Sequence, residues 1–148
     1  MSPDGSIVSF RRAGRGVPRA AIRQFGERLV SEVMEERRFD CLLTDDRELR
    51  RLNRDFLGHD YPTDVLSFPS GSNHGFAGEI AISVNRAADQ AAEFGHDLEQ
   101  EIEILMLHGA LHLTGMDHEK DRGAMARAEK QWRKHFQLPA SLIERVRR

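Results

Sequence analysis

The residues with the clearest chemical potential are three histidines in one short segment, His108, His112 and His118. The first two are four residues apart in a segment that we predict to be helical, so both imidazoles project from one helix face, one turn apart. Gly115 follows and can adopt the left-handed backbone conformation that ends a helix. The chain then turns back, which allows His118 to supply a third ring nitrogen. The spacing therefore predicts a site for one metal ion.

The ligand type indicates which metal chemistry to expect. Three neutral imidazoles on zinc leave the fourth tetrahedral position for water, as in catalytic zinc sites, whereas structural sites more often recruit cysteine. The single cysteine, Cys41, lies in an apolar run, where we expect a buried and inert thiol. Bound zinc lowers the pKa of its water from about 15.7 towards about 7 and polarises phosphoryl or carbonyl oxygens. A metal-dependent hydrolase is the leading class, although histidine-rich sites also bind nickel and copper tightly.

The histidine spacing also matches the H-E-x-x-H-x-x-G-x-x-H frame of the metzincin peptidases, in which the glutamate is the general base. Gly109 occupies the position of that glutamate, which disfavours peptide hydrolysis by that route. Two carboxylates, Asp117 and Glu79, are candidates for orienting a ligand imidazole. A helix cap or a surface ion pair is an equally good interpretation of each.

Apolar periodicity and capping residues predict the elements that position these residues. The predicted strands cover residues 6–10, 39–43, 64–68 and 79–84, and the predicted helices cover 19–33, 45–52, 87–94, a long segment from 97 through the first two histidines, and 120–136. The length of 148 residues suits a single domain spanning 1–148.

Composition excludes several other classes of protein. Hydrophobic residues make up 39% and charged residues 31%, which argues against disorder and low complexity. No apolar run approaches the roughly 18 residues of a membrane helix, and residues 1–10 lack a signal-peptide layout, so we expect a cytoplasmic protein without a membrane partner. The net charge of −2 argues against an electrostatic grip on nucleic acid by the whole surface, although residues 11–23 carry five arginines.

Several segments together resemble one family. The stretch from His108 to His118, HGALHLTGMDH, resembles the HGxLHLxGYDH signature of the YbeY family, bacterial ribosomal-RNA maturation factors described as single-strand endoribonucleases. Residues 46–53, DRELRRLN, resemble the helix that precedes a loop in that family. Residues 62–69, PTDVLSFP, and 78–83, GEIAIS, resemble its two strand motifs, in the same order.

The resemblance implies an α+β fold, a small mixed four-stranded sheet backed by about five helices, with a metzincin-like metal helix. It implies one zinc ion held by His108, His112 and His118, which makes these the candidate catalytic residues. It also implies cleavage of single-stranded precursor RNA at the 3′ end of small-subunit ribosomal RNA, with the ribosomal subunit and ribosome-associated proteins as partners.

This sequence departs from the family pattern at positions that concern RNA. Leu57 stands where the family usually has an arginine thought to meet RNA phosphate. We expect His59, or Arg54 one helical turn earlier, to replace it as the phosphate contact. Glu79 replaces the usual aspartate, and Met116 replaces the usual tyrosine.

Three functions therefore compete. The first is a zinc-dependent, single-strand-specific endoribonuclease that acts in ribosome biogenesis and quality control. The second is a non-enzymatic ribosome assembly factor in which metal only stabilises the end of the helix, an interpretation that Leu57 makes more credible. The third, disfavoured by Gly109, is a zinc metallopeptidase.

Overall fold

The computed structural model describes residues 6–71, 75–117 and 120–140. Four strands form one sheet in the order β1-β2-β4-β3. Their bounds are β1 (Val8–Phe10), β2 (Arg38–Thr44), β3 (Val65–Pro69) and β4 (Phe76–Ser83). β1, β2 and β4 run parallel, and β3 is antiparallel to β4. The predicted mixed four-stranded sheet is confirmed.

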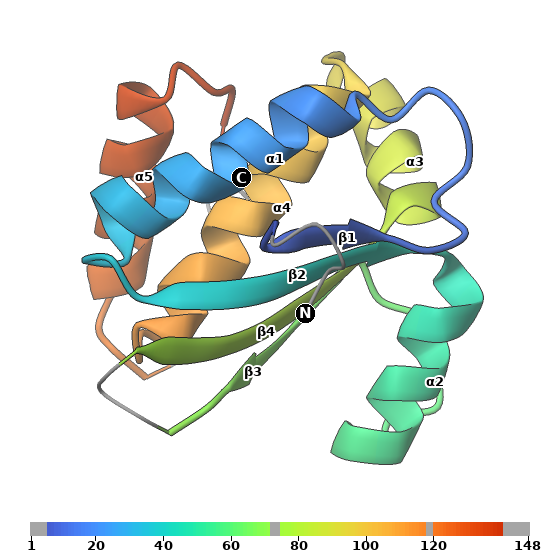
Figure 1. Ribbon diagram of the computed structural model, residues 1–148, viewed down its shortest axis with the longest axis horizontal. Coiled ribbons are helices and arrows are strands. Elements are labelled where there is room, and N and C mark those ends of the chain that lie inside the picture. Colours follow the sequence, from blue (N-terminus) through green and yellow to red (C-terminus); the bar gives the residue numbers. More distant parts are fainter. Residues whose placement is uncertain (1–5, 72–74, 118–119, 141–148) are drawn as a thin grey trace.

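The helices of the described residues cover the sheet unequally. Their bounds are α1 (Arg19–Arg28), the π-helical turn η1 (Leu29–Val33), α2 (Asp46–Leu57), α3 (Val84–Phe94), α4 (Leu98–Leu113) and α5 (Ala124–His135). Helices α1, α3, α4 and α5 lie on one side of the sheet and α2 lies on the other (Figure 1). The main core fills the first side, and a smaller cluster around Leu49, Leu66 and Ala81 joins α2 to the second. The predicted α+β class is therefore confirmed.

Helix α4 is the central element. It contacts β3, β4, α1, α3 and α5. Eleven of its sixteen residues are buried, as expected for a helix surrounded by other elements. Asp97 and Gln100 form a capping box at its start, with the Asp97 carboxylate accepting from the Gln100 amide at 2.8 Å.

Capping hydrogen bonds and strand pairing decide where the elements differ from prediction. Helix α2 continues to Leu57, five residues beyond the expected end, and stops at Gly58, which has φ +75°. Helix α3 begins at Val84 because the Ser83 hydroxyl caps it by accepting from the Arg86 amide. Strand β4 begins at Phe76 because its first residues already pair with β2 and β3.

Burial accounts for the behaviour expected of Cys41. Its side chain lies in the core, and burial raises the pKa of the thiol to about 12. The prediction of a buried, inert thiol is therefore consistent with the structure.

Within residues 6–71, 75–117 and 120–140, no helix has both the length and the apolar character to cross a bilayer.

Candidate active site

The structure brings His108 and His112 together on one face of α4. Their ring centroids are 4.8 Å apart and the ring planes meet at 76°. His108 is buried and His112 is half-buried. The four-residue spacing on a helix is sufficient to produce this arrangement.

The turn after α4 fixes the orientation of the His112 ring. Gly115 has φ +101°, its amide donates to the His112 carbonyl at 3.0 Å, and the Met116 amide donates to the Leu111 carbonyl at 3.3 Å. These two bonds form a Schellman motif, which favours glycine at residue 115. The motif also brings the Met116 carbonyl 3.0 Å from Nδ1 of His112. A carbonyl oxygen only accepts, so this ring is protonated at Nδ1.

The His108 ring is held by a carboxylate from another helix. Nδ1 of His108 lies 2.7 Å from Oε2 of Glu129, on α5. The Glu129 side chain is fully buried. A buried carboxylate requires hydrogen-bond donors, and the Nδ1–H group of His108 serves as one of them.

The two rings thus share a protonation pattern suited to a metal site. Each neutral ring with a proton on Nδ1 carries its lone pair on Nε2, and metal-binding histidines usually donate their other ring N–H to a carboxylate or carbonyl. His108 and His112 satisfy this condition with Glu129 and Met116, respectively. Within the described residues, no group of three His, Cys, Asp or Glu side chains could hold a metal. His118, the expected third ligand, lies outside the described residues.

A cavity of about 360 Å³ opens beside the two rings. Its walls come from β3, from α4 and from the turn after α4. Asp117 lines this cavity together with both histidines, as its candidate role requires.

Gly109 allows α4 to approach the sheet closely. A Cβ atom at this position would lie 3.0 Å from Cδ1 of Ile80 and 3.1 Å from Oγ of Ser67. The Ser67 hydroxyl donates to the Gly109 carbonyl at 3.3 Å, across the same contact. The position of the metzincin glutamate therefore faces the packed sheet in this chain, where a long side chain would displace its neighbours.

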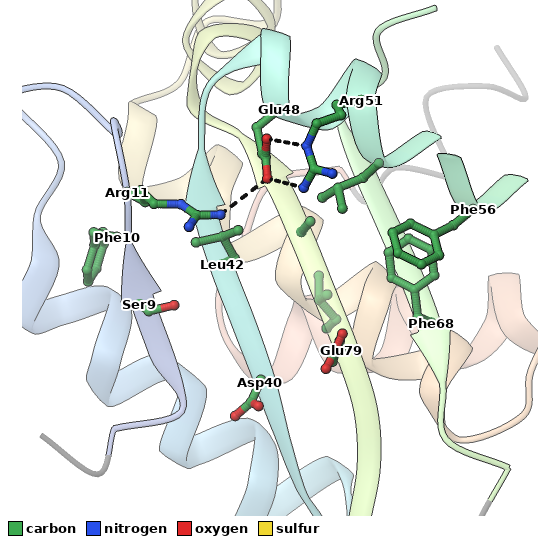
Figure 2. A pocket seen from close by; sticks show the side chains of 13 residues that line it. Ser9, Phe10, Arg11, Asp40, Leu42, Glu48, Arg51, Phe56, Phe68 and Glu79 are labelled. Carbon is green, nitrogen blue, oxygen red and sulfur yellow. Dashed lines mark hydrogen bonds and ion pairs between the residues drawn. The ribbon is translucent and has the colours of Figure 1, made fainter. Parts of the chain in front are cut away.

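Glu79 lies on the other side of the sheet. Its neighbour Ile80 faces α4, and successive strand residues point to opposite faces. Glu79 instead lines a second cavity of about 720 Å³, into which Asp40 of β2 also points (Figure 2). Glu79, one of the two candidates for orienting a ligand imidazole, is therefore kept away from the histidines by the strand register. Glu129 contacts the His108 ring instead.

Ion pairs around a buried carboxylate line one end of the second cavity (Figure 2). Glu48 contacts Arg51 at 2.7 Å and Arg11 at 3.2 Å (Figure 2). The hydrogen bond from Arg51, with the charges of Arg51, Arg11 and Arg12, lowers the pKa of Glu48. Arg12 lies 3.7 Å from the Asp45 carboxylate, so two of the five arginines at residues 11–23, Arg11 and Arg12, have partners within the chain.

The two residues expected to contact RNA lie near the end of α2. Arg54 Nε lies 3.1 Å from the Asp55 carboxylate, and the His59 ring lies beside Tyr61, with centroids 5.4 Å apart. The loop after α2, residues 58–64, is held by a 2.9 Å hydrogen bond from the Asn53 side chain to the Tyr61 carbonyl. It leads directly into β3, which lines the histidine cavity.

The pairing of Glu129 with His108 was missed by reasoning from the sequence. The two residues are 21 positions apart and belong to different helices. A signal was present, because Glu129 lies four residues after Met125 and three before Trp132, which places it in the apolar stripe that these two residues form on one helix face. A carboxylate in such a stripe indicates a buried polar partner.

Comparison with known proteins agrees with the resemblance. The family model described as endoribonuclease YbeY matches residues 11–137. A protein named endoribonuclease YbeY from Solibacter usitatus is 60% identical over 145 residues, covering 98% of this chain and 97% of that protein. A protein of the same name from Koribacter versatilis is 44% identical over 140 residues, covering 95% of this chain and 91% of that protein.

A solved structure shares the fold. The solution structure of TM1509 from Thermotoga maritima has a TM-score of 0.59 and 29% sequence identity, and the match covers 84% of this chain and 85% of that one. With a family model that spans most of the sequence and relatives that match almost end to end, the chain belongs to the endoribonuclease YbeY family.

Proposed function

We propose that this protein is a zinc-dependent endoribonuclease that cleaves single-stranded RNA. The observation that carries the proposal is the pair of histidines, each anchored through Nδ1, beside one cavity in a chain of the endoribonuclease YbeY family. Its substrate is the precursor at the 3′ end of small-subunit ribosomal RNA. The proposal places the protein in the cytoplasm, in ribosome biogenesis and quality control, with the ribosomal subunit and its associated proteins as partners.

The residues fit a zinc site in type and protonation. His108 and His112 would hold the ion through Nε2, together with His118. Bound zinc would supply Lewis acidity and a water of lowered pKa at the scissile phosphate. Asp117 lines the cavity with both rings, so it is the candidate to orient a ligand or to take up a proton released in the reaction.

The test is cleavage of an end-labelled single-stranded RNA by the purified protein, with and without a chelator. We expect cleavage that the chelator abolishes and added zinc restores, with little cleavage of a duplex of the same sequence. A 2′,3′-cyclic phosphate on the product would show that the ribose 2′-hydroxyl attacks phosphorus, and its absence would indicate attack by water. A protein that binds zinc and RNA without cleaving would contradict the proposal and favour the assembly-factor alternative.

We further propose that the end of α2 and the loop after it, residues 58–64, guide RNA towards the cavity beside His108 and His112. We expect His59→Ala and Arg54→Ala each to weaken binding of single-stranded RNA by about fivefold, because each removes one exposed contact worth about 1 kcal/mol. Arg54→Ala should also reduce the salt dependence of binding, by about 0.7 in the slope of log K against log salt. Fluorescence anisotropy at several salt concentrations measures both effects.

Arg47 provides the matched control for the loop. It is an exposed arginine near the start of the same helix, two turns before Arg54. Arg47→Ala should bind and cleave RNA like the unmodified protein. If His59→Ala and Arg54→Ala also bound and cleaved like the unmodified protein, the proposed contact would be wrong.

A further inference from the structure

Among the residues that the structure describes, two histidines each form a pair with a fully buried glutamate. In the first, His108 lies 2.7 Å from Glu129, with side chains 8% and 0% exposed. In the second, His96 lies 2.6 Å from Glu101, with the same exposed fractions, 8% and 0%. The chemistry and burial of the pairs are matched, but only His108 lines the histidine cavity.

Glu129 is held in place from outside the cavity. It lies on α5, whose first turn is fixed by Asp121, since the Asp121 carboxylate accepts from the amides of Gly123 at 3.1 Å and Met125 at 2.8 Å. Met125 and Ala126 of the same helix are buried in the main core. The carboxylate therefore meets the His108 ring from a helix that is capped at its start and packed against α4.

A carboxylate in this position acts on the ring in two ways. It keeps the proton on Nδ1, so the neutral ring presents Nε2 as its lone-pair nitrogen. It also raises the basicity of that nitrogen and prevents rotation of the ring. The Met116 carbonyl likewise accepts from Nδ1 of His112, but it is a neutral acceptor. The hydrogen bond from His108 to a charged carboxylate is therefore the stronger of the two.

We propose that Glu129 is a positioning residue for the metal site, which sets metal affinity by holding His108 with its proton on Nδ1. The inference rests on the proposed function, because it assumes that His108 binds the metal. It adds α5 to the elements that form the site. It also gives Glu129 a role for which Glu79 was a candidate, before the strand register placed Glu79 on the other side of the sheet.

The test compares two nearly isosteric substitutions, Glu129→Gln and Glu101→Gln. Zinc affinity of the full-length protein is measured by competition with a chromophoric chelator, and thermal unfolding is followed for each variant. Both variants lose a buried charged hydrogen bond, so both are expected to lose stability. We expect only Glu129→Gln to bind zinc more weakly, by about 10- to 100-fold, while Glu101→Gln stays close to the unmodified protein.

The outcomes separate a positioning role from a structural one. Equal loss of zinc affinity in both variants, or none in Glu129→Gln, would overturn the inference while the proposed function stands. An unmodified protein that binds no zinc would overturn both. Glu129→Asp keeps the charge, and partial recovery of affinity relative to Glu129→Gln would support the role.

A measurement on the unmodified protein avoids any dependence on how the variants fold. Long-range proton–nitrogen NMR correlations of the zinc-loaded protein report the tautomer of each histidine ring. We expect His108 to carry its proton on Nδ1. A His108 ring with its proton on Nε2 would overturn the inference.

Discussion

Replacement of His112 by alanine is expected to lower cleavage of single-stranded RNA by about three orders of magnitude. The substitution removes one of the two described rings that face the cavity, and with it a metal ligand of the proposed site. A metal ion contributes several kcal/mol of charge stabilisation in hydrolysis, and each 1.36 kcal/mol is a tenfold change in rate, so loss of the ion costs about a thousandfold. The rate is measured with end-labelled RNA under single-turnover conditions.

His135→Ala is the control for the His112 substitution. This exposed histidine pairs with Glu32 at the end of α5 and does not line the cavity. We expect it to cleave RNA at the rate of the unmodified protein. Preparing both variants identically also exposes contaminating ribonuclease, because a contaminant would cleave equally in every sample. Cleavage by His112→Ala at the unmodified rate, without such contamination, would remove this histidine from the reaction.

Gly78→Ala is expected to destabilise the protein by about 3 kcal/mol. The residue has φ +144°, a conformation that side chains rarely adopt. A Cβ atom would collide with the Phe68 carbonyl oxygen and would lie 2.9 Å from Cδ2 of Leu113 and 3.0 Å from Cα of Pro69. Backbone strain costs about 1–3 kcal/mol and overpacking costs about 1–3 kcal/mol more. Two of the colliding groups are backbone atoms of β3, which cannot turn away as a flexible side chain could.

The comparison for Gly78 is Gly95→Ala. Gly95 also has a positive φ, +74°, but a Cβ atom there would meet nothing within 4 Å. Its substitution should therefore cost only about 1 kcal/mol, from the left-handed backbone alone. Urea unfolding of both variants measures the difference. Equal destabilisation by the two substitutions would show that the close approach of β3 at residue 78 adds nothing to the loss of stability in Gly78→Ala.

The structural features behind these predictions differ in how far the sequence alone predicts them. The pairing of His108 with His112 follows from a spacing of four on a helix, and the turn at Gly115 follows from the backbone freedom of glycine. The capping box at Asp97 is equally local, since its partners are three residues apart. Such features depend on neighbours within one or two turns, so the residue order determines them.

The start of β4 was not determined locally. It depends on pairing with two other strands, β2 and β3. The collision at Gly78 depends in the same way on the close approach of β3. Strand register and interhelical contact are long-range, and periodicity in one segment carries no information about them.

The sequence by itself determined the family, the helix that carries His108 and His112, and the turn that follows it, because each depends on short motifs of residues close together in the chain. Only the tertiary structure decided which carboxylate supports a histidine. Glu79 was placed on the far side of the sheet by the alternation of its strand, and Glu129 reached His108 because α5 packs against α4. A carboxylate's partner depends on which surfaces meet when the chain folds, and that is settled by the packing of the whole core.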